Sequence, residues 1–143
     1  METRVTVLVV AHSNADRLRR TLAAVADQSR TPDRVIGIAV DAKDDVTRAF
    51  EDSGVERIVT VSENVSFGRA LAAGVRELGE PVDEEFLWLL AQDTVPEPAA
   101  LARLLAGVEV APSVAVAGPK VVDADDATRI RSLGETVTTF WPR

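Results

Sequence analysis

The sequence contains no cysteine and only one histidine, His12. Without cysteine the chain has no disulfide, no thiolate ligand for zinc or an iron–sulfur cluster, and no cysteine nucleophile. No serine or cysteine elbow accompanies His12, which argues against a hydrolytic triad. We expect His12 to be structural or to make one polar contact.

Long apolar runs are missing as well. The first apolar run, residues 5–11, ends at a polar stretch before any cleavage-like pattern, so no signal peptide is visible. No segment approaches the roughly 20 apolar residues that span a bilayer. We therefore expect a cytoplasmic protein, which would lie at the cytoplasmic face of the membrane if the chain is part of a larger one.

Positive charge is scarce, since the formal net charge is −7. A field of that sign repels the phosphate backbone of nucleic acids, so we expect no nucleic-acid partner. An anionic small molecule is compatible with this charge, because a metal ion or a helix N-terminus holds phosphate locally. The length of 143 residues, with 46% hydrophobic residues, fits one domain over residues 1–143.

Apolar runs alternate with amphipathic segments along the chain. Strands are expected over residues 5–11, 35–40, 57–61, 85–91 and 114–117, with 121–122 as a further candidate. Helices are expected after Ser13 or Asn14, over 44–52, over 67–78 with Ser66 as N-cap, and from Pro96 or Pro98 onward. The strand over 85–91 is the most apolar, and we place it in the middle of the sheet. The alternation predicts a three-layer α/β/α fold with a mostly parallel sheet and right-handed crossovers.

Polar residues follow the first four predicted strands, and ligands of open α/β sheets bind outside the carboxyl ends of strands. These residues are His12, Ser13, Asn14, Asp41, Glu63, Asn64, Gln92, Asp93 and Thr94. Because the carboxyl ends of parallel strands share one edge of a sheet, we expect all of them to line one rim.

Asp93 stands out in this set, because a carboxylate directly after the apolar run 88–91 needs water, a donor or a metal. Carboxylate oxygens suit Mg²⁺ or Mn²⁺ that bridges two phosphates. Asp93 fits equally well as the cap of the helix expected from Pro96. Spacing alone leaves both roles open.

The segment 64–70 places small and basic side chains in the first turn of a helix, where backbone N–H groups favour anions. Arg69 is either a diphosphate contact or an ordinary exposed helical arginine. Glycine inside a helix, as expected for Gly68, lowers the stability of the helix by about 1 kcal/mol relative to alanine. Close approach of a ligand to the backbone is therefore its expected use.

In their order along the chain, these segments resemble family 2 glycosyltransferases, which have the GT-A fold. The resemblance rests on Val9–Asn14 with Leu18, Thr21, Leu22 and Gln28, on Asp41, on Asn64 with Phe67–Ala70 and Gly74, and on Leu89–Pro96 with Glu97, Pro98 and Leu101. It covers residues 5 to 120. The last stretch is similar to the DXD-type metal site of the family, above all in its actinobacterial members.

The resemblance implies transfer of a sugar from a nucleotide-diphosphate donor to an acceptor, usually with inversion and with a carboxylate base near the acceptor. The donor-nucleotide site that it implies comprises Ala11, His12, Asn14, Asp41, Asn64, Gly68, Arg69 and Gln92. A divalent metal, Mn²⁺ or Mg²⁺, is expected on Asp93. These residues identify neither the acceptor nor the base.

Three features depart from the family pattern. Gln92 stands where many relatives have the first acid of the metal motif, which leaves Asp93 as its sole carboxylate. The loop over 41–45 only approximates the family's loop, so the donor is not specified. The base and acceptor loops of the family lie downstream of the metal site, where this chain has only residues 121–143. We therefore expect the N-terminal part of a larger transferase, with little turnover by itself.

The tail over 136–141 is expected to add an edge strand or to leave apolar surface for a missing half or a second copy of the chain. A non-catalytic binding or interaction module with a degenerate GT-A fold is the alternative function. A receiver domain would need an acidic pair after the first strand, and a dinucleotide-binding oxidoreductase would need a glycine-rich turn there. The sequence has neither.

Overall fold

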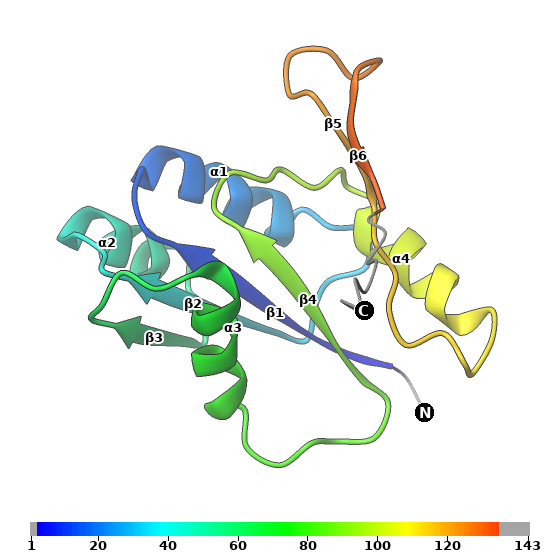
Figure 1. Cartoon of the computed structure of the whole chain (residues 1–143), viewed down its shortest axis with the longest axis horizontal. Coiled ribbons are helices and arrows are strands. Elements are labelled where there is room, and N and C mark those ends of the chain that lie inside the picture. Colours follow the sequence, from blue (N-terminus) through cyan, green and yellow to red (C-terminus); the bar gives the residue numbers. More distant parts are fainter. Residues whose placement is uncertain (1–2, 135–143) are drawn as a thin grey trace, which may run out of the picture. The chain divides into compact units, whose positions relative to one another are not determined.

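The computed structural model describes residues 3–134, and the chain forms two compact units, Met1–Leu101 and Ala102–Arg143. The first unit contains a parallel four-stranded sheet (Figure 1). Its strands are β1 (Arg4–Ala11), β2 (Arg34–Val40), β3 (Arg57–Val61) and β4 (Glu85–Ala91), in the spatial order β3-β2-β1-β4. The four strands predicted for this part of the chain are all present.

Helices cover both faces of this sheet, as Figure 1 shows. They are α1 (Ala15–Ala26), α2 (Asp44–Asp52) and α3 (Phe67–Arg76). The chain moves in one direction from β1 to β3, so right-handed crossovers place α1 and α2 on the same face. It then returns past β1 to β4, which places α3 on the opposite face. The predicted α/β architecture with a mostly parallel sheet is confirmed.

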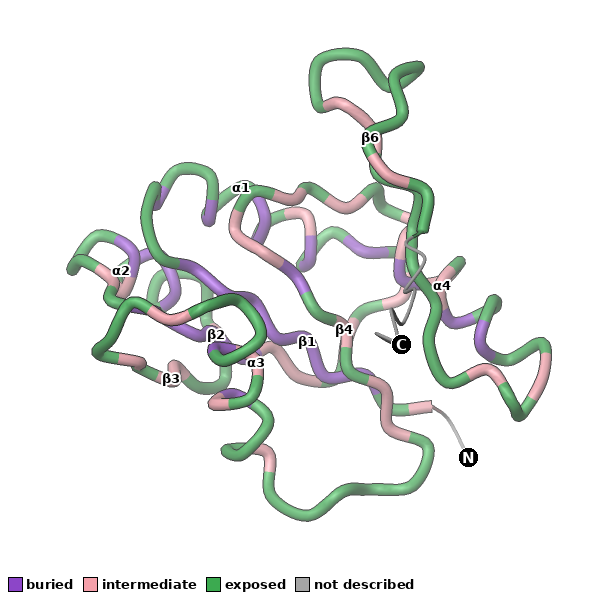
Figure 2. Tube along the Cα trace, viewed as in Figure 1, coloured by how far each residue is buried: buried purple, intermediate pink, exposed green. Residues whose placement is uncertain are grey.

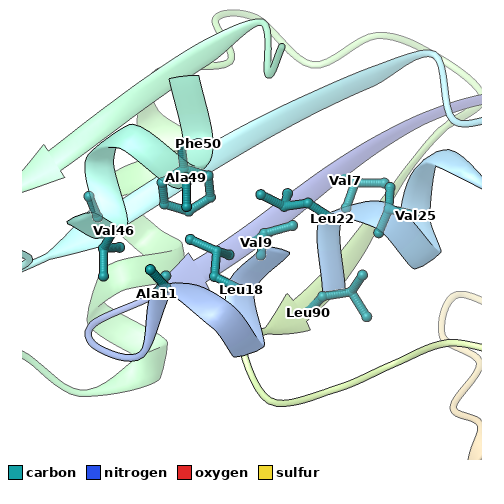
Figure 3. Packing of buried hydrophobic residues seen from close by; sticks show 12 residues of the cluster. Val7, Val9, Ala11, Leu18, Leu22, Val25, Val46, Ala49, Phe50 and Leu90 are labelled. Atoms are coloured by element: carbon teal, nitrogen blue, oxygen red, sulfur yellow. The ribbon is translucent and has the colours of Figure 1, made fainter. Parts of the chain in front are cut away.

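The face under α1 and α2 holds the larger part of the core (Figure 3). Phe50 of α2 is fully buried, and its ring lies over Gly37 of β2. A Cβ atom at Gly37 would come within 2.5 Å of the Phe50 ring, so only glycine leaves room for that ring. The other buried residues of this cluster are Val7, Val9, Ala11, Ala15, Leu18, Leu22, Val25, Ala39, Val46, Ala49 and Leu90.

On the opposite face, α3 packs closely over β1 and β2. Ala70 is fully buried in this second cluster. A Cβ atom at Gly74 would lie 2.4 Å from Cδ1 of Ile38. Gly74 thus permits the close approach of α3 to the sheet, which explains why it forms part of the sequence pattern.

Two helix starts are fixed by side chains of the predicted residues. The Oδ1 atom of Asn14 accepts a hydrogen bond from the N–H of Arg17 at 3.1 Å, and Ser66 caps α3 through the N–H of Arg69. Asn14 itself has a left-handed backbone with φ of 58°. Both caps satisfy N–H groups that lack a partner within the helix.

The position predicted for β4 in the sheet is wrong. Among residues 3–134, β4 pairs only with β1, so it is an edge strand rather than a central one. Figure 2 shows β1 buried along nearly its whole length, whereas β4 is only partly buried. Leu87 and Leu89 are 39% and 46% exposed. An apolar run signals a strand, but it does not say which neighbours cover it.

Helix α4 (Ala100–Glu109) begins later than predicted and continues into the second unit. The segment from Pro96 to Pro98 lies outside the helix, and a turn forms in which the N–H of Ala100 donates to the carbonyl of Glu97 at 2.9 Å. Proline is tolerated in a first turn, but here it only precedes one. None of the helices among the described residues is long and apolar enough to cross a membrane.

The second unit also contains an antiparallel hairpin, β5 (Lys120–Val122) and β6 (Ile130–Leu133). The strand predicted over 114–117 is wrong, because these residues have no regular structure. The side chain of Val116 is 85% exposed there, so most of it is not covered by other described residues. The candidate strand at 121–122 is confirmed within β5. The tail over 136–141 lies outside the described residues, and the single domain over 1–143 stays a prediction.

Candidate functional site

A pocket of about 320 Å³ opens at the carboxyl ends of the strands in the first unit. In the order β3-β2-β1-β4 the direction of strand addition reverses between β1 and β4, and such a switch point is where open α/β sheets bind ligands. The lining residues are Val10, His12, Val40, Asn64, Val65, Phe67, Gln92 and Asp93. The structure therefore brings together four residues that the sequence singled out: His12, Asn64, Gln92 and Asp93.

Gln92 ties the two loops of the switch point together. Its Oε1 atom accepts hydrogen bonds from the backbone N–H groups of His12 at 2.8 Å and Ser13 at 3.0 Å. Its Nε2 atom lies 3.4 Å from Oγ of Ser13. An amide oxygen has two lone pairs, and both are engaged here. Gln92 thus holds the loop after β1, and its oxygen is not free to bind a metal.

The ring of His12 has a defined tautomer. Its Nδ1 atom lies 2.9 Å from the carbonyl oxygen of Val40. A carbonyl oxygen only accepts, so Nδ1 carries the proton in this contact. In the neutral ring Nε2 is then a hydrogen-bond acceptor. The Nε2 atom of His12, whose ring is held by β2, can thus accept a hydrogen bond from an N–H group of a ligand.

Asp93 lies in the turn after β4, and its side chain is exposed. Its carboxylate has no hydrogen bond or ion pair with any residue from 3 to 134. Helix α4 begins only at Ala100, which is too far along the chain for Asp93 to cap it. Of the two roles left open by spacing, the cap is excluded, and the metal ligand stays a prediction.

The described residues contain no group of three His, Asp or Glu side chains that would enclose a metal ion. Asp93 is the one carboxylate that lines the pocket. Magnesium-type ions bound to nucleotides take most of their oxygens from phosphate and water, with one or two protein carboxylates. A single exposed carboxylate therefore fits an ion that arrives with a diphosphate, and it does not fit an ion held by the protein alone.

Gly68 and Arg69 lie in the first turn of α3, beside the pocket residue Phe67. Apart from its own chain neighbours and the backbone of its helix, no described atom lies within 4 Å of the place where a Cβ of Gly68 would stand. The guanidinium of Arg69 has no hydrogen-bond or ion-pair partner within residues 3–134. Both positions are open to a ligand, and neither has a structural role that would explain its residue type.

Three other predicted nucleotide contacts do not line the pocket. Ala11 is buried in the core under α1, and the side chain of Asn14 caps that helix. Asp41 is exposed after β2, where its N–H donates to the carbonyl of Val61 at 2.7 Å. Its φ of 42° lies in the left-handed region, a conformation that clusters at binding sites and that aspartate tolerates. The donor roles of all three stay predictions.

Sequence reasoning missed the apolar wall of the pocket, which consists of Val10, Val40, Val65 and Phe67. Val10 and Val40 belong to the apolar runs of their strands and gave no separate signal. Phe67 is the first residue of the helix expected over 67–78, and its side chain is 46% exposed. An exposed aromatic ring beside polar groups is typical of a surface that receives a flat ligand.

Comparison with known proteins finds two kinds of similarity and one absence. The family model described as "Glycosyltransferase like family 2" matches residues 3–142. No curated protein matches the chain.

Among solved structures, the chain is similar to glucosyl-3-phosphoglycerate synthase from Mycobacterium tuberculosis. In the complex with Mn²⁺, UDP-glucose and phosphoglyceric acid, the identity is 17% and the TM-score 0.59, over 78% of this chain and 41% of that chain. For the complex with UDP, the values are 18% and 0.55, over 73% and 39%. The chain thus spans about two fifths of the length of these structures. The similarity at this level of identity concerns the fold.

The structural similarity confirms the GT-A-like fold predicted from the sequence, and the family model covers nearly the whole chain. This chain belongs to the glycosyltransferase-like family 2.

Proposed function

We propose that this domain binds a nucleotide-diphosphate sugar at the carboxyl end of its sheet and serves a glycosyltransferase in transferring that sugar to an acceptor. The observation that carries the proposal is the unpartnered carboxylate of Asp93 in a pocket at the switch point of the sheet. A solvated carboxylate without a structural partner, in such a place, is typical of a ligand site.

The lining of the pocket divides into two chemical zones. Val10, Val40, Val65 and Phe67 supply an apolar wall that suits a flat nucleobase. The Nε2 atom of His12 supplies an acceptor for an N–H group of that base. Every nucleobase carries an N–H donor, in its ring or as an exocyclic amino group, so this acceptor does not select among the bases.

The diphosphate belongs near the first turn of α3 and near Asp93. Arg69 offers a free guanidinium, and Gly68 leaves the backbone of this turn open. The chain has a formal charge of −7, so a diphosphate needs local positive charge to bind. Arg69 and a divalent ion on Asp93, Mn²⁺ or Mg²⁺, would provide it.

The metal ion, when bound, neutralises the diphosphate and so stabilises it as the leaving group. The residues of this chain bind and orient the donor: Asp93 through the metal, Arg69 through charge, and Gln92 by holding the loop that carries His12. The acceptor and the catalytic base have no assigned residues. We infer that the chain alone binds the donor and transfers sugar slowly at most.

Isothermal titration with UDP, UDP-glucose, GDP and dTDP, with and without Mn²⁺, tests this proposal. We expect the wild-type chain to bind at least one of them, and to bind it more tightly with Mn²⁺. Asp93→Asn removes the charge with little change in volume, and it should abolish the gain that Mn²⁺ gives.

Asp83→Asn is the matched control for this substitution. Asp83 is an exposed carboxylate just before β4, whereas Asp93 lies just after that strand. Asp83→Asn therefore removes one negative charge at the other end of β4 and should leave the Mn²⁺ gain unchanged. An equal loss in both variants would mean that net charge, and not the pocket, governs binding.

One observation favours a second function. The Gln92 oxygen already accepts hydrogen bonds from two N–H groups, so Asp93 is the one candidate metal ligand among the described residues that line the pocket. A domain that kept the fold but not the metal chemistry would serve as a binding or interaction module. Such a domain would bind none of the four nucleotides, with or without Mn²⁺.

A further inference from the structure

The turn that carries Asp93 is closed by Thr94, whose N–H and Oγ1 both donate to the carbonyl of Ala91, and it also lies against one buried hydroxyl. Thr21 of α1 is fully buried. Its Oγ1 atom lies 2.9 Å from the carbonyl oxygen of Gln92 and 2.7 Å from that of Thr94. These two residues flank Asp93 directly in the chain, so the hydroxyl lies against one carbonyl on each side of it.

A second contact holds the chain farther along. Gln28, near the end of α1, is 5% exposed. Its Nε2 atom donates to the carbonyl of Glu97 at 2.8 Å, and its Oε1 atom accepts from the N–H of Leu101 at 3.0 Å. Gln28 thus holds the segment before α4, but it makes no hydrogen bond with Gln92 or Thr94, the described residues on either side of Asp93.

We propose that Thr21 is a positioning residue, which fixes the turn 92–94 so that the Asp93 carboxylate points to the donor diphosphate and its metal ion. The inference rests on the proposed function of the site. The side chain of an exposed aspartate in a turn would otherwise sample many orientations. Restricting it to one orientation on binding costs conformational entropy, which weakens affinity. The hydroxyl of Thr21 reduces that freedom before the ligand arrives, because its one proton is within reach of a carbonyl on each side of Asp93 and can be donated to either from a buried helix face.

Thr21 was part of the sequence pattern, yet nothing in the sequence predicts this role. The contacts join residues that lie 71 and 73 positions apart in the chain. A buried threonine at helical spacing is usually explained by its own helix, and Oγ1 of Thr21 does lie 3.2 Å from the carbonyl of Arg17. The additional carbonyls of the turn distinguish this threonine from such a case.

The test compares Thr21→Val with Gln28→Leu in the 143-residue chain. Thr21→Val replaces the hydroxyl by a methyl group of similar size, and Gln28→Leu removes a buried polar group just beyond the end of the same helix. Both should lower the melting temperature, because each leaves buried backbone groups without their partner. Only Thr21→Val should weaken the Mn²⁺-dependent binding of UDP, by about 10-fold, as is common when a group that orients a metal ligand is lost. Binding of UDP without Mn²⁺ should change less than about 2-fold in either variant, since the pocket lining is intact.

Two further variants keep the test decisive if Thr21→Val does not fold. Thr21→Ser retains the hydroxyl and should restore Mn²⁺-dependent binding, whereas Thr21→Ala lacks it and should not. Amide hydrogen exchange at Asp93 and Thr94, measured without ligand, should be faster in the variants that lack the hydroxyl and unchanged in Gln28→Leu.

The outcomes separate this inference from the proposed function. Wild-type affinity for UDP and Mn²⁺ in Thr21→Val, or equal losses in Thr21→Val and Gln28→Leu, would overturn the positioning role alone. A wild-type chain that binds no nucleotide with Mn²⁺ would overturn the proposed function and, with it, the role of Thr21 toward the metal.

Discussion

Gly68 offers a prediction in which stability and binding move in opposite directions. It is the second residue of α3, and a Cβ atom added there meets no described atom within 4 Å apart from its own chain neighbours and the backbone of its helix. Alanine in a helix is more favourable than glycine by about 0.5–1 kcal/mol. Gly68→Ala should therefore raise the free energy of unfolding by this amount, which corresponds to a rise of about 2–5 °C in Tm for a chain of this size.

The same methyl group should weaken nucleotide binding if a phosphate approaches the backbone at Gly68. Overfilling a packed site typically costs about 1–3 kcal/mol, which corresponds to a loss in UDP affinity of about 5- to 150-fold. Thermal unfolding followed by circular dichroism and calorimetric titration with UDP and Mn²⁺ measure the two effects on the same samples.

Gly107→Ala is the control for this pair of effects. Gly107 lies within α4, and an added Cβ there is 4.0 Å from that of Ala117, an ordinary contact. This variant should gain stability like Gly68→Ala and keep the wild-type affinity for UDP. If Gly68→Ala is more stable and also binds UDP as the wild type does, then close approach of the ligand at Gly68 is refuted.

Two further predictions concern the fold itself. Gly74→Ala should destabilise the chain by about 1–3 kcal/mol in chemical denaturation, because the new methyl group would stand 2.4 Å from Cδ1 of Ile38; a gain in stability would contradict the close packing of α3. The Asp33 carboxylate accepts a hydrogen bond from the N–H of Val5 and pairs with Arg30, which together hold the pKa of Asp33 below its usual value. Its stabilising effect is therefore present above the unfolded-state pKa of about 4 and is lost as the pH falls through the lower folded-state pKa. Asp33→Asn should lower the free energy of unfolding at pH 7 by less than about 1 kcal/mol, since the side chain is 43% exposed, and Tm should fall with it. The difference from wild type should vanish in acid; a constant difference at all pH values would exclude this linkage.

The sequence predicted the four strands of the parallel sheet and its three covering helices because these elements have strong local signals. Residues 44–52 and 57–61 match the structure at both ends, since acidic residues begin α2, and Gly54, with φ of 68°, lies just beyond its end. Signals of this kind come from residues that are close together in the chain, and the sequence shows all of these residues directly.

The errors arose where the answer depends on distant neighbours. The run 85–91 is apolar enough for a central strand, yet β4 lies at the edge of the described sheet. The valines over 114–117 alternate like a strand, but no partner strand is present among residues 3–134. Strand pairing is a property of two segments, and one segment does not encode it.

For the site, the rim was predictable and its internal contacts were not. Parallel strands end at one edge, which is why His12, Asn64 and Asp93 were expected together and do line one pocket. The bond from Gln92 to the loop after β1 and the anchoring of the turn by Thr21 join residues at least 71 positions apart. Such contacts require the fold to be known first.

The most direct test of the account is the affinity of the wild-type chain and of Asp93→Asn for UDP, each measured with and without Mn²⁺. We expect Mn²⁺ to strengthen UDP binding by the wild type and to have no effect on the variant, while UDP binding without metal is similar in both. An equal Mn²⁺ effect in the two proteins, or no UDP binding by the wild type under either condition, would contradict the assignment of Asp93 and of the pocket as a metal-assisted donor site.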